Sequence, residues 1–264
     1  MNNYGIQGKV AIVTGASSGI GFAIANSLAS EGVNLLLISR NEGKLNGAAD
    51  LISKSHDIEI KTLSGDVADE ELPSKAKKVV NDSWSCCDIL VNNAGGPPMG
   101  SFMNHSENSW LGAYNTNFFS AVRFTKLFVD DMKENKWGRI LNVTSSLAKE
   151  PTPQMVLSAT MRAALSSFTK AVSTELAPFG ITLNTICPGG VLTERLTSLV
   201  KESAKNQGIP YEEALKASQD NIPIGRFASP EEFADIATFM LSEQGRYLTG
   251  VSLMADGGLT KGIF

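Results

Sequence analysis

The chain has 264 residues, of which 42% are apolar and 19% charged, so it can bury a large core. Its net charge is −4 and it has no block of Lys and Arg, which argues against a nucleic-acid-binding surface. No apolar run approaches the roughly 18 to 20 residues of a membrane span, and the N-terminal segment has no apolar signal-peptide core. We therefore expect a cytoplasmic protein with neither nucleic acid nor membrane as a partner.

The three cysteines do not make a disulfide framework. Cys86 and Cys87 are adjacent, and adjacent cysteines bridge only with strain. We expect both to be reduced and Cys187 to serve packing. Since no His/Cys/Asp cluster has metal-ligand spacing, no metal is predicted.

Short apolar runs alternate with longer runs of helical period, which is typical of a parallel sheet with crossover helices. The predicted strands are Val10–Thr14, Val33–Ser39, Ile58–Ser64, Ile89–Asn93, Arg139–Thr144, Ile181–Ile186 and Val251–Ala255. The predicted helices are Ile20–Ser30, Gly43–Lys54, Pro73–Ser83, Ser109–Glu134, Ser158–Ala177 and Pro230–Leu241. The pattern predicts an α/β chain with a Rossmann-type, doubly wound, seven-stranded parallel sheet flanked by helices. We expect one domain over residues 1–264.

The first strand runs into a glycine-rich loop and then a helix. Residues 14–21 read Thr-Gly-Ala-Ser-Ser-Gly-Ile-Gly. Such glycines let the backbone turn tightly, approach a pyrophosphate and pack helix on strand. The helix N-terminus offers free N–H groups to that phosphate. The motif predicts a dinucleotide site that includes Gly15, Ser17, Ser18, Gly19, Ile20 and Gly21.

The end of the second predicted strand bears on the choice of dinucleotide. An acidic residue there would bind the ribose 2′-OH of NAD, whereas an Arg accommodates the 2′-phosphate of NADP. This strand ends in Ser39 and Arg40, and a guanidinium is a bidentate donor for phosphate. NADP is therefore favoured, with NAD as the alternative if Arg40 is only a solvated surface residue.

One stretch departs from the alternating pattern. Residues 190–226 form a long, mostly polar segment between a strand and the next helix, with a helix-compatible piece at Tyr211–Ser218. Loops of this length are often lids, and a position after the carboxyl end of a strand favours a lid over the ligand crevice. Five apolar residues of this segment predict an apolar pocket: Leu192, Leu196, Leu199, Ile209 and Ile222.

Further motifs follow the later strands in order. They are Asp66-Val67, Asn92-Asn93-Ala94-Gly95, Asn142-Val-Thr-Ser-Ser146, Pro188-Gly189-x-x-x-Thr193 and Thr249-Gly250 followed by Asp256-Gly257-Gly258. With the glycine loop, they make the chain resemble the short-chain dehydrogenase/reductase family over essentially its whole length. It is most similar to 3-oxoacyl-[acyl-carrier-protein] reductase-like members, and residues 92–98 resemble a divergent subgroup that lacks the usual catalytic residues.

The resemblance implies roles by position. Asp66 and Val67 would hold the adenine. Asn93, Ala94 and Gly95 would line the adenosine ribose side, and Pro188, Gly189 and Thr193 would contact the nicotinamide end. Asn117 matches the family asparagine that holds a water in the proton relay. Ser145 matches the serine that binds the substrate oxygen, although Ser146 is an alternative. Family members usually form dimers or tetramers through two long helices and the last strand, so a homotetramer or homodimer is implied.

The chain departs from the family at two catalytic positions. Ser158 and Arg162 stand where the resemblance predicts a proton-donating Tyr and a Lys. Because Tyr occurs only at positions 4, 114, 211 and 247, no shift of the alignment supplies it. Arg162 is cationic and can bind ribose hydroxyls, but a Ser hydroxyl is a much weaker acid than a phenol. Loss of a general acid typically costs about 10²–10⁴-fold in rate.

Other groups are candidates for the missing acid. They are Lys149 with Glu150, His105 and Tyr211, although an ordinary solvated residue is the better explanation for each. The leading hypothesis is a carbonyl/alcohol oxidoreductase with a modified proton relay and a small-molecule substrate. A dinucleotide-binding sensor or scaffold, and non-redox chemistry on the same fold, are the alternatives.

Overall fold

The computed structural model describes residues 4–263. Residues 1–3, at the start of the N-terminal segment considered above, and Phe264, at the end of the predicted domain, lie outside the described residues. A seven-stranded sheet runs in the order β3-β2-β1-β4-β5-β6-β7, and every neighbouring pair is parallel. The strands are β1 Val10–Thr14, β2 Asn34–Ser39, β3 Ile60–Ser64, β4 Ile89–Asn92, β5 Gly138–Val143, β6 Ile181–Pro188 and β7 Ser252–Ala255. The predicted Rossmann-type sheet is confirmed.

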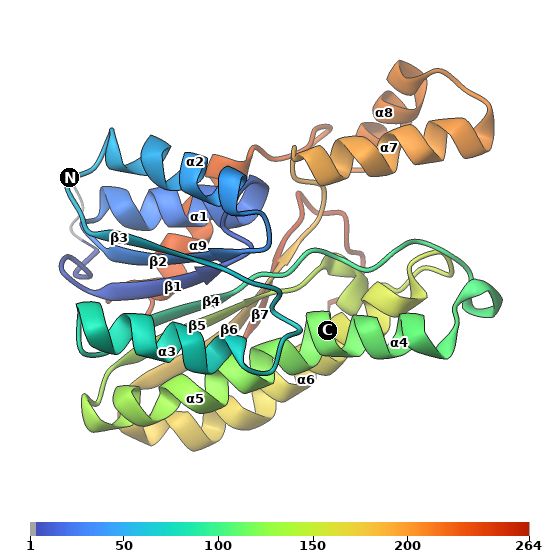
Figure 1. The fold of residues 1–264 in the computed structure, drawn as a ribbon. Coiled ribbons are helices and arrows are strands. Elements are labelled where there is room, and N and C mark those ends of the chain that lie inside the picture. The colour runs from blue at the N-terminus through green and yellow to red at the C-terminus, as the bar shows by residue number, and fades with distance from the viewer. Residues whose placement is uncertain (1–3, 264) are drawn as a thin grey trace.

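Helices cover both faces of this sheet (Figure 1). On one face lie α1 Gly19–Ser30, α2 Glu42–Ser53 and α9 Pro230–Leu241. On the other lie α3 Leu72–Ser83, α5 Ser120–Glu134 and α6 Val156–Leu176, with α4 Glu107–Tyr114 beside α6. Two cores result because successive strand residues point to opposite faces. In β1, Ala11 and Val13 enter the first core, and Ile12 enters the second.

The predicted helix Ser109–Glu134 is wrong as a single element. The structure has α4, then a π-helical turn over Asn115–Phe119, then α5. A π-turn inserts one extra residue into a helix and changes which side chains face inward. Here it buries Asn117 at 3% exposure, an outcome that apolar periodicity alone does not specify.

The segment at residues 190–226 is also more ordered than the sequence indicates. It contains two helices, α7 Glu194–Gln207 and α8 Tyr211–Asp220, of which only part of α8 was predicted. Val200 and Ala204 pack on Ala214 between the two helices. This α7–α8 pair stands away from the helices that cover the sheet (Figure 1).

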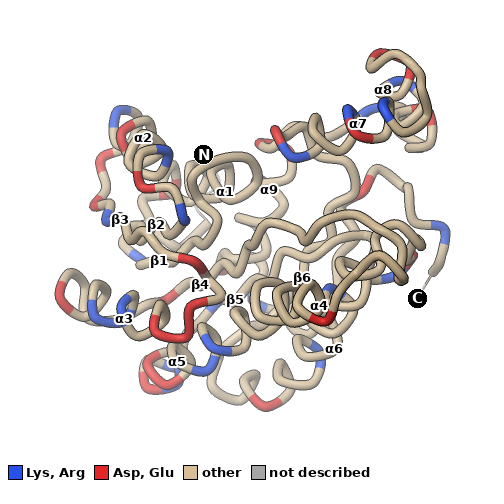
Figure 2. Tube along the Cα trace, turned by 45° about the vertical axis from the view of Figure 1, so that its right-hand side comes forward, with Lys and Arg blue, Asp and Glu red and all other residues tan. Residues whose placement is uncertain are grey.

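Among the described residues, Lys and Arg are interspersed with Asp and Glu along the outer helices, without a continuous basic tract in the trace (Figure 2). Cys86, Cys87 and Cys187 are free thiols, as predicted. Within residues 4–263, no group of His, Cys, Asp and Glu has the arrangement of a metal site. No helix in that range is both long and apolar enough to cross a membrane.

Candidate functional site

The order of the strands predicts where a ligand binds. The chain reverses its direction of winding between β1 and β4, and ligands of such sheets bind outside the carboxyl ends of the strands at this point. Thr14 ends β1 and Asn93 follows β4. The Thr14 hydroxyl donates to the Asn93 carbonyl oxygen at 3.0 Å and accepts from the Asn93 N–H at 2.8 Å. These bonds hold the two strand ends together beneath the crevice.

The glycine loop lies tightly against this junction. Gly15 has φ +63°, and a Cβ there would lie 2.5 Å from the Asn93 carbonyl oxygen. A Cβ on Gly21 would lie 2.3 Å from the Gly15 carbonyl oxygen. No larger residue fits at either position, so the loop forms the close-fitting cradle that the sequence predicts for a pyrophosphate.

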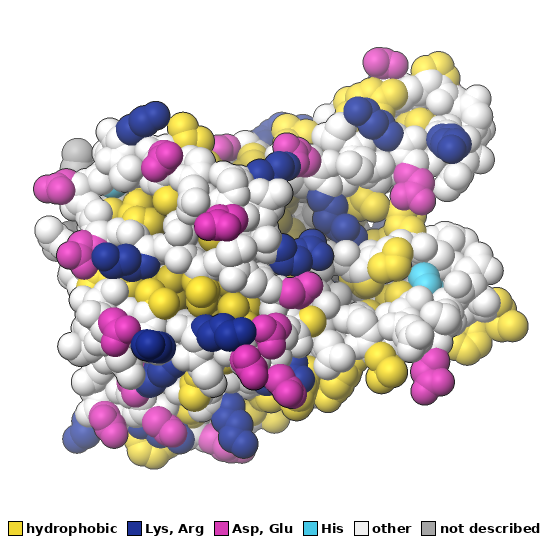
Figure 3. Space-filling view, viewed as in Figure 1, with side chains coloured by type: hydrophobic (Ala, Val, Ile, Leu, Met, Phe, Trp, Pro, Cys, Tyr) yellow, Lys and Arg dark blue, Asp and Glu magenta, His cyan; other side chains and the backbone are white. Residues whose placement is uncertain are grey.

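Two adjoining clefts open above the strand ends. The first, called here the Ser145 cleft, has a volume of about 460 Å³ and lies between the strand ends and the α7–α8 pair. The second, the Arg40 cleft, has about 540 Å³ and extends past the ends of β2 and β3. They share a wall made by Gly15, Ser18, residues 93–96 and Arg195. Figure 3 shows the hollow beneath the α7–α8 pair, with basic side chains at its mouth.

The two clefts bring together nearly all predicted site residues. The Arg40 cleft is lined by Gly15, Ser17, Ser18, Ser39, Arg40, Asp66, Val67, Asn93, Ala94, Gly95 and Asn117. The Ser145 cleft is lined by Gly15, Ser18, Gly19, Ile20, Asn93, Ala94, Gly95, Ser145, Ser146, Ser158, Arg162, Pro188, Gly189 and Thr193. Of the predicted residues, Gly21 lines neither cleft, because it packs α1 against the loop behind Gly15.

The residues of the Arg40 cleft fit a phosphorylated dinucleotide. The Ser39 hydroxyl is buried and has no hydrogen-bond partner among the described residues, and a buried polar group without a partner is costly. Arg40 beside it is exposed and makes no ion pair within residues 4–263. A hydroxyl and a guanidinium that both lack a partner match a ribose 2′-phosphate.

Ser145 is held in a defined orientation at the end of β5. Its side chain caps the 3₁₀ turn Ser146–Ala148 by accepting the Leu147 N–H at 3.2 Å. Because this bond uses an oxygen lone pair, the hydroxyl hydrogen remains available for an acceptor in the cleft. The geometry fits a donor to a substrate oxygen.

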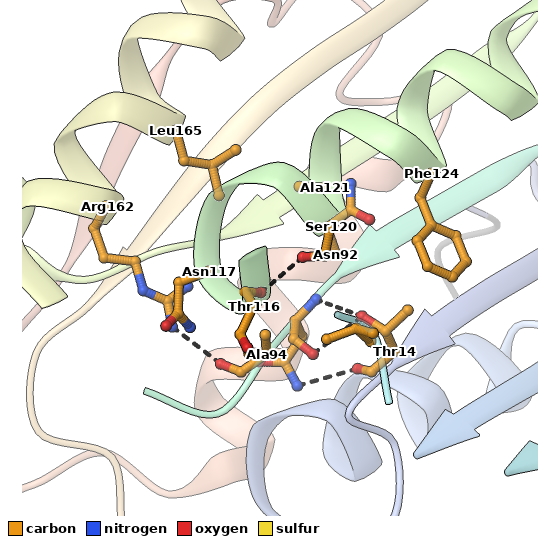
Figure 4. A pocket seen from close by; sticks show the side chains of 12 residues that line it. Thr14, Asn92, Ala94, Thr116, Asn117, Ser120, Ala121, Phe124, Arg162 and Leu165 are labelled. Carbon is orange, nitrogen blue, oxygen red and sulfur yellow. Dashed lines mark hydrogen bonds between the residues drawn. The ribbon is translucent and has the colours of Figure 1, made fainter. Parts of the chain in front are cut away.

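Ser158 and Arg162 lie one turn apart in α6, and each side chain is 6% exposed. Arg162 donates from Nη1 to the Val143 carbonyl oxygen and from Nη2 to the Ala94 carbonyl oxygen at 3.0 Å. It thereby links α6 to the end of β5 and to the segment just after β4, and the bond to Ala94 is drawn in Figure 4. Burial lowers the pKa of Arg162 to about 10, and the nearby positive charge of Arg195 adds to this.

Asn117 reaches the same region from the π-turn (Figure 4). Its Nδ2 donates to the Gly95 carbonyl oxygen at 2.7 Å, and its Oδ1 is buried without a partner among the described residues. Arg162 Nε is likewise buried and unpaired there. Both side chains line a void of about 10 Å³, close to the roughly 10–15 Å³ that one water requires.

Comparisons with known proteins identify the family. A family model described as enoyl-(acyl carrier protein) reductase matches residues 15–260. The chain belongs to the short-chain dehydrogenase/reductase family. The NADPH-dependent reductase BacG of Bacillus subtilis is 32% identical over 256 residues, which are 97% of this chain and 99% of BacG. The 3-oxoacyl-[acyl-carrier-protein] reductase FabG of Vibrio harveyi is 33% identical, with 96% and 98% of the two chains covered.

A solved member of the family has nearly the same fold. The structure of L-sorbose reductase from Gluconobacter frateurii, complexed with NADPH and L-sorbose, superposes with a TM-score of 0.95. The two sequences are 34% identical, and the match covers 99% of this chain and 100% of the other.

None of the alternative acids named from the sequence lines the Ser145 cleft. His105 bonds through Nε2 to the Gly100 carbonyl oxygen, and Tyr211 packs in the core between α7 and α8. Glu150 accepts the backbone N–H groups of Lys261 and Gly262, while Lys149 is exposed. The ionisable side chains lining this cleft in the described chain are Arg162, Glu194 and Arg195. No Tyr, His, Cys or Lys side chain lines it among the described residues, and its one carboxylate, Glu194, pairs with Lys44 at 3.3 Å.

The apolar wall of the cleft differs partly from the prediction. Leu196, Leu199 and Ile222 line it. Ile209 instead packs between α7 and α8, and Leu192 is exposed. Phe227 and Leu259, which the sequence does not single out, also line it. The sequence does not single out Arg195 either, for which the only signal is a basic residue two positions after Thr193.

Proposed function

We propose that this chain is an NADPH-dependent reductase that converts a small-molecule carbonyl into an alcohol through a modified proton relay. The observation that carries the proposal is the convergence of Ser145, Ser158 and Arg162 on one cleft that adjoins the glycine loop. BacG is an NADPH-dependent reductase by name, and the L-sorbose reductase structure contains NADPH. The chain would act as one domain over residues 1–264, with α7 and α8 as its lid.

The residues that would hold NADPH follow the two clefts. The glycine loop would bind the pyrophosphate, and Ser39 with Arg40 would bind the 2′-phosphate. Asp66, Val67 and residues 93–95 would surround the adenosine. Pro188, Gly189 and Thr193 would contact the nicotinamide, with Arg162 beneath its ribose. When bound, the cofactor supplies the hydride.

The chain's own residues would manage the charge that develops on the carbonyl oxygen. The Ser145 hydroxyl donates a hydrogen bond to that oxygen, and Ser158 provides a second hydroxyl one helical turn from Arg162. The fixed guanidinium of Arg162 stabilises the developing alkoxide electrostatically. The alkoxide then takes the proton of the Ser158 hydroxyl, Ser158 regains a proton from a water molecule, and the hydroxide that remains takes up a proton from bulk solvent.

This relay would place the chain in a divergent subgroup of the family that lacks the usual Tyr and Lys. Asn117 would keep its family role beside the cation, because its Oδ1 and Arg162 Nε border the same small void. The Ser145 cleft has apolar residues, Leu196, Leu199 and Phe227, as well as the hydroxyls of Ser145 and Ser158. This combination favours a substrate with both an apolar part and a carbonyl.

We also infer a homotetramer, with a homodimer as the alternative. The last strand and α9 carry half-exposed apolar side chains, among them Leu253, Ile236 and Phe239, which a second copy would cover. Sedimentation equilibrium measures the mass of the assembly, and a monomeric species at micromolar concentration would exclude this inference.

The experiment that tests the function is a turnover assay with NADPH and a panel of ketones, β-ketoacyl esters, aldehydes and sugars. We expect NADPH oxidation with at least one class, with alcohol formed in equal amount. Ser145→Ala should reduce kcat about 10²–10³-fold, whereas the control Ser146→Ala should change it less than threefold. Binding of NADPH without turnover of any panel member would refute the reductase.

That outcome would support a second function, a dinucleotide-binding sensor or scaffold. The observation favouring it is that no Tyr, His, Cys or Lys side chain lines the Ser145 cleft among the described residues. Non-redox chemistry, the third hypothesis, would instead give product without net consumption of NADPH.

A further inference from the structure

Arg195 occupies the wall that the two clefts share, together with Gly15 and Ser18 of the glycine loop. The glycine loop is the part of the site that receives a pyrophosphate. Arg195 faces this position from the opposite side, at the start of α7. Of the residues on the shared wall, Arg195 alone carries a charge.

The Arg195 guanidinium has no acidic partner. It makes no ion pair within residues 4–263, and its hydrogen bond there runs from Nη2 to the Pro97 carbonyl oxygen at 3.1 Å. The other guanidinium donors remain available for a ligand. The charge of Arg195 is close enough to Arg162 to lower its pKa. Within residues 4–263 neither cation forms an ion pair with a carboxylate, and two such cations favour an anion between the lid and the loop.

Two small residues allow this approach. A Cβ on Gly96 would lie 2.5 Å from Arg195 Nη2, so the guanidinium occupies space that a side chain at position 96 would take. On the other rim, the Thr193 methyl carbon lies 3.1 Å from where a Cβ of Gly19 would be. The start of α7 thus packs both on the glycine loop, at Gly19, and on residues 96–97.

We propose that Arg195 is a cofactor-binding residue that clamps the dinucleotide pyrophosphate from the lid side. The proposal rests on the proposed use of NADPH, and it adds a lid residue to a pyrophosphate site otherwise made of backbone N–H groups. The guanidinium places its free donors on the phosphate oxygens, and this contact adds to those that already hold the start of α7 on the glycine loop.

The test measures ligand affinity by calorimetry on the full chain, without turnover. The ligands are NADPH, 2′-phospho-ADP-ribose, which keeps the pyrophosphate, and adenosine 2′-monophosphate, which lacks it. Arg195→Ala should raise the Kd of the first two at least tenfold and change the third less than twofold. Arg195→Lys should have a smaller effect, since it keeps the charge but not the bidentate donor. The matched control is Lys201→Ala on the same helix, which should change none of them.

Gly96→Ala displaces the guanidinium without removing its charge, and it should weaken the same two ligands by a smaller factor. An unchanged Kd of NADPH in Arg195→Ala would overturn the proposal. A parallel loss for adenosine 2′-monophosphate would overturn it too, because the effect would then be long-range attraction. If the wild type binds NADPH through Arg195 but reduces no carbonyl, the reductase fails and the clamp stands.

Discussion

Arg162 donates from Nη2 to the Ala94 carbonyl oxygen at 3.0 Å, just after β4, one of the two strands between which the sheet reverses its winding. The same side chain also donates to the Val143 carbonyl oxygen at the end of β5. The cation is therefore part of the floor of the cleft as well as a group that faces it. Substitution of Arg162 should therefore change both the stability of the fold and the reaction in the cleft.

We expect Arg162→Met to lower the free energy of unfolding by about 1–3 kcal/mol, because hydrogen bonds from a charged donor contribute about 1.5–3 kcal/mol each while removal of a buried charge offsets part of this. Urea denaturation measures the change. Arg123→Met is a matched control. Arg123 donates to a single backbone carbonyl oxygen, that of Ala68, and is less buried than Arg162, which donates to two. An Arg162→Met protein as stable as the wild type would contradict a role in the floor.

Most of the fold follows from the sequence because its signals are local. The order of buried apolar runs and helical runs determines a parallel sheet, and Gly15, Gly19 and Gly21 mark the first βα turn. Hydrogen bonds between the ends of adjacent strands, such as those between Thr14 at the end of β1 and Asn93 after β4, follow once the order of the strands is known.

The parts that sequence reasoning missed depend on contacts between distant segments. The π-turn at Asn115–Phe119 exists where Asn117 bonds to Gly95, 22 residues earlier. The Arg195 guanidinium fits against Gly96 and donates to the Pro97 carbonyl oxygen. The Glu150 carboxylate accepts a hydrogen bond from the Lys261 N–H. Periodicity carries no information on such pairs, so the roles of Arg195 and Glu150 emerge only in three dimensions.

A double substitution tests whether the missing phenol limits the rate. In Ser158→Tyr with Arg162→Lys, the hydroxyl gains a pKa near 10 that a neighbouring cation lowers toward neutrality. We expect kcat for a ketone to rise at least 10²-fold, with a new pH dependence between pH 6 and 9. The control is Ser158→Phe with Arg162→Lys, which supplies the ring without the acid. Equal rates for the two double variants would mean that proton donation does not limit turnover.

Arg40 should determine the preference for the phosphorylated cofactor. Loss of a charge-assisted bond to phosphate costs about 1.5–3 kcal/mol, which corresponds to a roughly 10–150-fold higher Kd. We expect this for NADPH with Arg40→Ala, while the Kd of NADH stays within twofold. Fluorescence titration measures both. Lys44→Ala removes a nearby exposed charge that pairs with Glu194, and it should leave the ratio of the two affinities unchanged.

Acid should weaken the junction between the lid and α9 through Glu232. Its carboxylate accepts two bonds from Arg226 and one from the Ser229 N–H, and these lower its pKa from 4.5 to about 2. In that interval the unfolded chain binds more protons than the folded one, so the stabilisation present above pH 4.5 is lost as the pH falls toward 2. Glu232→Gln should therefore be less stable than the wild type at pH 7 and equally stable near pH 2.

Urea midpoints at pH 7, 3.5 and 2.5 measure this convergence, and added salt should reduce the difference at pH 7 because the pair is exposed and screened. Glu231→Gln is the control, because it removes the neighbouring first-turn carboxylate of α9, which makes no ion pair within the described residues. A difference between wild type and Glu232→Gln that stays constant from pH 7 to 2.5 would show that the shape of the side chain, and not its charge, stabilises this junction.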